Sequence, residues 1–302
     1  MRTRFAPSPT GPLHLGHAYS AILAHDRARA AGGEFLLRME DIDRTRCKPE
    51  WESLIYDDLR WLGLDWDEPV VRQSERSAAY DAALDALWER DLLYPCDCNR
   101  RDIANAASAP NEGDPLVGPD GLVYPGTCRT KPGMPNSMLR RPVNENLRLD
   151  AATAAHGCGV FNHRIDTPDG GWHWYAGFEE TGDGEGHPRG LIEFTPDVFC
   201  RSIGDVVLAR RDMGTSYHLS VVIDDSAQGI THVFRGEDLF EATNIHVILQ
   251  RLLGLPTPVY HHHKLIRDAA GKRLAKRDDA RAIRKYREDG ASPADIRAMV
   301  GL

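Results

Sequence analysis

Residues 5–17 decide the fold of this chain and read Phe5-Ala6-Pro7-Ser8-Pro9-Thr10-Gly11-Pro12-Leu13-His14-Leu15-Gly16-His17. The prolines and glycine of residues 7–12 predict a loop, because these residues fit poorly inside a regular element. The flanking residues predict a short strand over residues 3–6 and a helix over residues 14–31. A helix N-terminus has unpaired N–H groups and a partial positive charge, which favour a bound anion by about 0.3–1 kcal/mol. The segment therefore predicts a strand–loop–helix unit that suits an anionic ligand.

Two histidines and a glycine mark the first turn of this predicted helix. His14 and His17 are three positions apart, so they share one face of the helix. Gly16 lets a flat ligand approach the backbone closely, because it has no Cβ atom. Ring nitrogens on that face can hydrogen-bond phosphate oxygens as charge builds up in a transition state. Taken alone, the pair fits two ordinary histidines at a helix start equally well.

Outward from this unit, strands alternate with helices along the chain. Strands are predicted at residues 35–39, 206–209, 231–234 and 259–266, and helices near residues 51–62, 77–92, 217–223 and 239–253. Between these halves, residues 96–129 are rich in Pro, Gly, Asn and Asp, and Asp169-Gly170-Gly171 predicts a hairpin turn. The alternation predicts an α/β fold with a Rossmann-type parallel sheet that is interrupted by an insertion.

The composition is that of an ordinary globular protein, with 302 residues, 41% hydrophobic and 27% charged. No apolar run approaches the roughly 20 residues that span a bilayer, and the start has no apolar signal region, so we expect a cytoplasmic protein without membrane association. The net charge of −8 argues weakly against nucleic-acid binding. However, basic residues gather in residues 264–287, and the local potential steers an RNA. This stretch also fits a solvated helix face.

Within this basic stretch, a motif follows Gly271 and reads Arg273-Leu274-Ala275-Lys276-Arg277. One interpretation is a loop whose Lys276 closes on a leaving pyrophosphate. The other is a solvent-exposed basic loop, which the motif by itself favours.

Together with the first segment, this motif resembles the glutamyl-tRNA synthetases, a family of class I aminoacyl-tRNA synthetases. Residues 5–17 resemble the HIGH-motif region of that family, and residues 273–277 resemble its KMSKS-type loop. Residues 38–46, 210–225 and 235–238 resemble three further blocks, in the family's order. The resemblance implies a catalytic domain that activates glutamate with ATP and magnesium.

The resemblance also implies roles for individual residues at the nucleotide. Catalytic roles fall on His14, His17 and Lys276, and ATP binding falls on His14, Gly16, His17, Arg273 and Lys276. Two residues depart from the family pattern: Arg273 stands in place of its first lysine and Ala275 in place of its serine. Arg273 keeps the charge but not the shape of lysine, and Ala275 lacks the hydroxyl.

A glutamate substrate carries two carboxylates and one ammonium group, so its site needs two cationic donors and an anionic acceptor. Arginine suits a carboxylate because it can donate two parallel hydrogen bonds. The resemblance implies that Arg4 and Arg235 take the carboxylates and Glu40 the ammonium. It further implies that Tyr217 supplies a hydroxyl and that Ala6 and Ser8 line the pocket. Two alternatives remain open, an ion pair between Arg4 and Glu40 at a strand edge and a core position for Tyr217.

Three of the six cysteines lie in the irregular insertion, as Cys96, Cys98 and Cys128. Thiolates are preferred ligands of structural zinc, usually four in tetrahedral array, although buried or free thiols are an alternative. The pattern resembles the zinc-binding insertion of the glutamyl-queuosine tRNA(Asp) synthetases, which implies Tyr124 as the fourth ligand. The other cysteines have no such spacing and are expected to be structural: Cys47, Cys158 and Cys200.

A run of three histidines, residues 261–263, is a weaker metal candidate. Neighbouring residues of an extended strand point to opposite faces, so the three rings do not converge on one ion. We expect strand or surface residues near the nucleotide side.

The chain ends soon after Lys276, in a segment that resembles only the start of the helical region that follows the KMSKS-type loop in full-length relatives. The expected division is residues 1–95 for the first half of the catalytic domain and 96–130 for the zinc-binding insertion. Residues 131–255 form an acceptor-like insertion and the second half, and residues 256–302 form the KMSKS-type loop and a short helical extension. No anticodon-binding domain is expected, and the protein is expected to be a monomer.

This shortened architecture resembles the glutamyl-queuosine tRNA(Asp) synthetases and implies that glutamate, activated without tRNA, is transferred to queuosine in the anticodon loop of tRNA(Asp). Unpaired loop bases are accessible for such recognition. A truncated glutamyl-tRNA synthetase that charges the 3′ end of tRNA(Glu) is an alternative. A catalytically inactive binding module is a remote one.

Overall fold

The computed structural model describes residues 1–107, 116–129, 138–167, 169–184, 186–266 and 281–302 of the chain. Arg273 and Lys276, with the rest of the predicted basic loop, lie outside the described residues. No helix in the described ranges is long and apolar enough to cross a membrane.

The first half of the chain forms a parallel three-stranded sheet with helices against it. Its strands run in the order β1 (Arg2–Phe5), β2 (Glu34–Met39) and β3 (Asp67–Arg72). The helices are α1 (Leu15–Ala30), α2 (Pro49–Trp61) and α3 (Ser77–Trp88). The strand–loop–helix unit predicted from residues 5–17 is therefore confirmed as β1, a loop and α1. The helix predicted over residues 77–92 ends earlier, at Trp88, before the short strand β4 (Leu93–Pro95).

A second sheet lies next to the first, because its strand β12 contacts β1. Its strand order is β10 (Gly190–Phe194), β9 (Trp172–Glu180), β13 (Val259–His263) and β12 (His232–Gly236). β13 is parallel to β12 and to β9, whereas β9 is antiparallel to β10 and to β8 (His163–Asp166). The amide of Thr231, just before β12, donates to the carbonyl of Arg2 at 2.9 Å. The parallel α/β architecture predicted from the sequence is thus confirmed, and so is the hairpin turn at residues 169–171.

Helices α7 (Tyr217–Ala227) and α8 (Thr243–Leu253) pack beside this second sheet, and their apolar faces share one core with α3 and β9. A separate core lies around α1, β1 and β2. Between the halves, β4, β7 (Leu147–Leu149) and β11 (Val207–Ala209) form a small antiparallel sheet. The remaining elements here are α4 (Arg100–Ala107), β5 (Val117–Gly118), β6 (Gly121–Leu122), α5 (Ala151–Gly157), α6 (Pro196–Val198) and the π-helical turn η3 (Phe199–Ile203).

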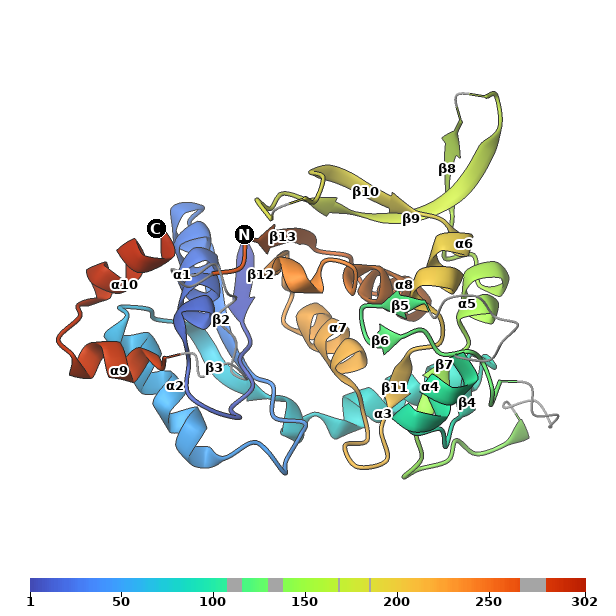
Figure 1. Ribbon diagram of the computed structural model, residues 1–302, viewed down its shortest axis with the longest axis horizontal. Coiled ribbons are helices and arrows are strands. Elements are labelled where there is room, and N and C mark those ends of the chain that lie inside the picture. Colours follow the sequence, from blue (N-terminus) through green and yellow to red (C-terminus); the bar gives the residue numbers. More distant parts are fainter. Residues whose placement is uncertain (108–115, 130–137, 168, 185, 267–280) are drawn as a thin grey trace.

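The last two helices, α9 (Ile283–Glu288) and α10 (Pro293–Val300), lie beside α1 and α2 at one end of the molecule, opposite the projecting β8–β9 ribbon (Figure 1). Ile283 is fully buried and its amide donates to the carbonyl of Leu13 at 2.8 Å. Arg297 pairs with Asp26 of α1 at 2.5 Å. These contacts fix the loop that leads into α1, so the C-terminal helices support the segment that the sequence singled out.

Candidate active site

A cavity of about 640 Å³ opens where the loop before α1 meets the ends of β1 and β12. It brings together every predicted glutamate or ATP residue that the structure describes: Arg4, Ala6, Ser8, His14, Gly16, His17, Glu40, Tyr217 and Arg235. These residues come from both halves of the chain. The cavity therefore forms only when the two sheets are joined at β1 and β12.

The two histidines cap the N-terminus of α1 reciprocally. The Nδ1 atom of His14 accepts from the amide of Gly16 at 3.1 Å, and the Nδ1 atom of His17 accepts from the amide of His14 at 3.2 Å. This arrangement is a capping box made from imidazoles instead of a hydroxyl and a carboxylate. A neutral imidazole that accepts through Nδ1 carries its proton on Nε2. Both rings can therefore present an N–H donor at Nε2. The capping role of their Nδ1 atoms was not revealed by the sequence.

Arg4 lies on the cavity floor and pairs with a carboxylate that the sequence did not single out. Its Nε and Nη2 atoms donate to the two oxygens of Asp225 at 3.0 and 3.2 Å. Arg38 approaches the same carboxylate at 2.8 Å. Burial raises the pKa of Asp225, but the two guanidinium groups outweigh it and the pKa ends below its ordinary value. The buried carboxylate therefore stays charged and holds both arginines.

Glu40 stands beside this cluster with a different partner from the one considered from sequence. It lies 3.6 Å from Arg38, whereas the ion-pair partner of Arg4 is Asp225. The alternative of a strand-edge ion pair between Arg4 and Glu40 is therefore wrong. Burial raises the pKa of Glu40 to about 7, against the opposing effect of Arg38 and Arg4. The carboxyl group thus titrates near neutral pH.

Arg235 and Tyr217 also line the cavity. Arg235 is buried, and its guanidinium lies 5.0 Å from the ring centre of Tyr260 and 3.0 Å from nitrogen atoms of His246 and His262. Tyr217 begins α7, directly after the N-cap Ser216, and is partly exposed in the cavity. Its ring also packs against the main core, so Tyr217 contributes to the core and to the cavity lining at once.

The histidine run forms part of β13, as predicted, but two of its rings are not on the surface. His262 and His263 are 1% and 3% exposed. His263 lines the cavity, and His262 reaches Arg235 from the neighbouring strand. The alternation of a strand predicts that neighbouring rings point to opposite faces of the sheet. It does not predict which of these faces is buried.

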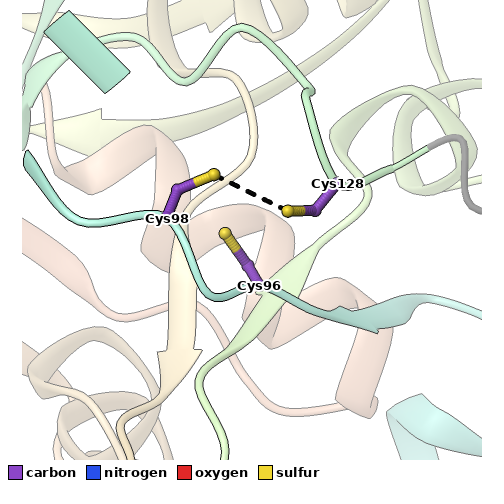
Figure 2. Close-up of side chains that lie close together, drawn as sticks. All are labelled: Cys96, Cys98 and Cys128. Atoms are coloured by element: carbon purple, nitrogen blue, oxygen red, sulfur yellow. Dashed lines mark hydrogen bonds between the residues drawn. The ribbon is translucent and has the colours of Figure 1, made fainter. Parts of the chain in front are cut away.

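Three thiols and one phenol meet at the small antiparallel sheet, away from the cavity. The Sγ atoms of Cys96, Cys98 and Cys128 lie within 4.8 Å of one another, and Figure 2 shows them pointing toward a common centre. The Sγ atoms of Cys98 and Cys128 are 3.6 Å apart. The hydroxyl of Tyr124 lies 3.4 Å from the sulfur atoms of Cys96 and Cys98. None of the six cysteines, all of which lie in the described part of the chain, forms a disulfide.

These spacings suit a metal ion. A tetrahedral zinc site with Zn–S near 2.3 Å and Zn–O near 2.0 Å requires sulfur atoms about 3.8 Å apart and sulfur–oxygen distances of about 3.5 Å. Arg148 adds a positive charge beside the ligand set, with Nε at 3.2 Å from the sulfur of Cys96 and its guanidinium 4.0 Å from the ring centre of Tyr124. The group could therefore hold a metal, with all four predicted ligands in reach.

The chain is similar to known enzymes over most of its length. The model of the catalytic domain of class I tRNA synthetases (E and Q) matches residues 1–113 and 186–302. A glutamate tRNA ligase from Elizabethkingia meningosepticum, solved in complex with its amino acid, superposes with a TM-score of 0.73 at 27% identity. The glutamate-tRNA synthetase of Elizabethkingia anophelis gives 0.74 at 26% identity. This chain is covered to 99% in both comparisons but spans only 60% and 61% of those longer proteins.

Fold and site thus define the catalytic domain of a class I tRNA synthetase. More similar relatives narrow this class. The glutamyl-Q tRNA(Asp) synthetase of Rhodobacter capsulatus is 63% identical over the full length of both chains. That of Nocardia farcinica is 40% identical over 98% of this chain and 82% of its own. The chain belongs to the glutamyl-Q tRNA(Asp) synthetase family.

Replacing Asp225 with asparagine tests the charge cluster under the cavity. The Asp225→Asn variant leaves Arg4 and Arg38 buried without their shared anion, and breaking a buried pair costs about 3–5 kcal/mol. We expect the free energy of unfolding in urea to fall by that amount. The control is Asp166→Asn, because Asp166 is an exposed carboxylate paired with Arg164, and its change should stay within about 0.5 kcal/mol. Equal losses in the two variants would contradict the assigned role.

Proposed function

We propose that this protein activates L-glutamate with ATP to form glutamyl-adenylate and then transfers the glutamyl group to queuosine in the anticodon loop of tRNA(Asp). The observation that carries the proposal is the convergence of Arg4, Glu40, Tyr217 and Arg235 with the α1 N-terminus in one cavity. The name of the relative that is 63% identical over the full length supports the choice of acceptor.

The two arginines offer a glutamate ligand different numbers of donors. A guanidinium has five N–H groups. Arg4 donates two of them to Asp225, which leaves three on its terminal nitrogens for a bidentate grip on a carboxylate. Arg235 donates four to protein groups and keeps one. Arg4 is therefore the bidentate ligand, Arg235 adds one hydrogen bond and its charge, and Glu40 takes the ammonium group.

ATP binds across the start of α1 in this proposal, with magnesium on its phosphates. Gly16 keeps the backbone open, and the Nε2–H groups of His14 and His17 donate to phosphate oxygens as their charge grows. A carboxylate oxygen of glutamate attacks the α-phosphorus, the bond to the bridging oxygen breaks, and pyrophosphate leaves with that electron pair. Arg273 and Lys276 are proposed to neutralise this leaving group. Transfer to the modified base then releases AMP.

Zinc is the metal we propose for the group formed by Cys96, Cys98, Tyr124 and Cys128. Zinc matches a donor set of three thiolates and one oxygen at the observed spacings. These four protein ligands would complete the coordination of the ion, which would then have a structural role. It would tie the strand end after β4 to the segment after β6.

Acceptor specificity tests the proposal directly. Purified protein is incubated with ATP, magnesium and labelled glutamate, together with queuosine-containing tRNA(Asp), queuosine-free tRNA(Asp) or tRNA(Glu). Label is expected on the queuosine-containing tRNA(Asp) alone. Label on the 3′ end of tRNA(Glu) would favour the truncated glutamyl-tRNA synthetase instead. Absence of glutamate-dependent ATP–pyrophosphate exchange would refute glutamate activation itself.

Glutamate activation should depend on pH through Glu40. Its pKa of about 7 lies above the ordinary value of 4.5, so the ionised form that binds the ammonium group appears only as the pH rises through 7. The value of kcat/KM for glutamate should therefore increase about tenfold between pH 6 and pH 8, measured by ATP–pyrophosphate exchange. The Glu40→Gln variant should have a lower kcat/KM and lose this increase. An unchanged rise in that variant would assign the titration to another group.

Metal content tests the thiol cluster. The protein should contain one zinc ion per chain by elemental analysis, and Cys98→Ala should lose it and unfold at a lower temperature, because binding stabilises the folded state. Cys158→Ala is the matched control and should keep the zinc, since Cys158 packs against the main core outside the cluster. Tyr124→Phe should weaken zinc binding in competition with a chelator. Unchanged zinc affinity in this variant would exclude the phenol as a ligand.

A further inference from the structure

Arg235 is the centre of a buried hydrogen-bond network that reaches far beyond the cavity. Its Nη1 atom lies 3.0 Å from Nδ1 of His246 on α8. The Nε2 atom of His246 lies 3.1 Å from Nδ1 of His218 on α7. The Nε2 atom of His218 lies 3.0 Å from both oxygens of Asp120. Four side chains from β12, α8, α7 and the β5–β6 turn are thus joined in one line.

The direction of every hydrogen bond in this line follows from arginine chemistry. A guanidinium has no acceptor, so the Nδ1 atom of His246 must carry a lone pair and its Nε2 atom must carry the proton when the ring is neutral. That proton points to His218, which accepts through Nδ1 and donates from Nε2 to Asp120. Burial and the adjacent Arg235 hold the pKa of His246 well below its ordinary value, which keeps the ring neutral.

A second, shorter line fixes the other side of the same guanidinium. The Nε atom of Arg235 donates to Nε2 of His262 at 3.0 Å, so the Nδ1 proton of His262 points to Glu180, with which it pairs. The Nη2 atom donates to the hydroxyl of Thr243 at 2.6 Å and to the carbonyl of Leu239 at 3.2 Å. Every nitrogen of the guanidinium is therefore held in place before a substrate arrives.

The end of the longer line is also fixed, although Asp120 itself is about half exposed. It lies in the turn between β5 and β6, and this hairpin packs closely on η3. A Cβ atom at Gly118 would come within 2.3 Å of the carbonyl oxygen of Ser202. The hairpin therefore cannot shift toward η3, and both carboxylate oxygens of Asp120 lie 3.0 Å from Nε2 of His218. Asp120 lies between the two halves of the thiol cluster in the sequence.

We propose that His246, His218 and Asp120 are positioning residues that orient the guanidinium of Arg235 for glutamate. This inference rests on the proposed role of Arg235 as a glutamate ligand. Because Arg235 keeps only one N–H group for the substrate, a small rotation of the guanidinium would remove that bond. His246, His218 and Asp120 together form a relay that fixes this rotation. His246 supplies the acceptor for Nη1, and Asp120 determines the orientation of His246 through His218.

The test uses the Asp120→Ala variant, whose substitution lies at a partly exposed turn and leaves the thiol cluster intact. Glutamate-dependent ATP–pyrophosphate exchange gives KM for glutamate, KM for ATP and kcat. Loss of one positioning hydrogen bond should raise KM for glutamate about three- to tenfold, with KM for ATP and kcat within about twofold. Asp166→Ala is the control for removal of an exposed carboxylate and should change none of the three constants.

Variants of His246 test the link between the carboxylate and the arginine. His246→Phe keeps an aromatic ring but removes the acceptor for Arg235, and should raise KM for glutamate more than Asp120→Ala does. His246→Gln restores an acceptor and a donor and should recover part of the loss. Since Asp120 acts only through His246, the double variant Asp120→Ala/His246→Phe should match His246→Phe alone. Thermal unfolding of each variant reports whether the fold is kept.

The outcomes separate this inference from the proposed function. A wild-type protein without glutamate-dependent exchange would refute the function. An active wild type whose KM for glutamate is unchanged in Asp120→Ala would refute the relay alone. Equal increases in KM for glutamate and for ATP, or a double variant whose effect is the product of the single effects, would also overturn it, because either result indicates a general structural role.

Discussion

The whole site depends on one buried carboxylate, Asp225, which two arginines from neighbouring strands share. Arg4 on β1 and Arg38 on β2 both reach it, and Asp225 itself lies on α7 in the other half of the chain. A buried charge without a partner is costly, so the halves are held together by charge as well as by apolar packing. The adjacent Asp224 adds to this link, since it accepts from Gln73 and is paired with Arg76. The cavity forms above this junction.

Much of the fold could be predicted from the sequence, because its signals are local, whereas the residues that line the cavity were implied by the family resemblance. The proline-rich loop between a strand and a helix, and the short distance from Cys96 to Cys98, are visible within a few residues. The paired carboxylate of Arg4 was not predictable in this way. Asp225 is 221 positions away and lies in an apolar helix where a sequence pattern does not show which charge is buried. The alternative of an ion pair between Arg4 and Glu40 was wrong for that reason.

The same limit applies to the relay behind Arg235. His218 and His246 lie on two different helices, and Asp120 lies in a turn that is almost 100 positions from His218. None of these three was assigned a role from the sequence, although His218 directly follows Tyr217. Only the packing of α7 against α8, and of the β5–β6 hairpin against η3, brings them into line. Their connection to the site lies in the N–H donors of Arg235, each of which needs an acceptor when it is buried.

The different partners of Arg4 and Arg235 have a consequence for the charge that a substrate meets. Arg4 is paired directly with a carboxylate, although that carboxylate also serves Arg38, so the three groups together keep one positive charge. Arg235 has neutral imidazoles as direct neighbours. One imidazole ring separates it from the carboxylate of Glu180, and two rings separate it from that of Asp120. Coulombic attraction falls with distance, so these anions compensate its charge less than a direct partner would. Histidine thus satisfies the donors of the buried guanidinium while leaving its charge available, which suits a ligand with two carboxylates.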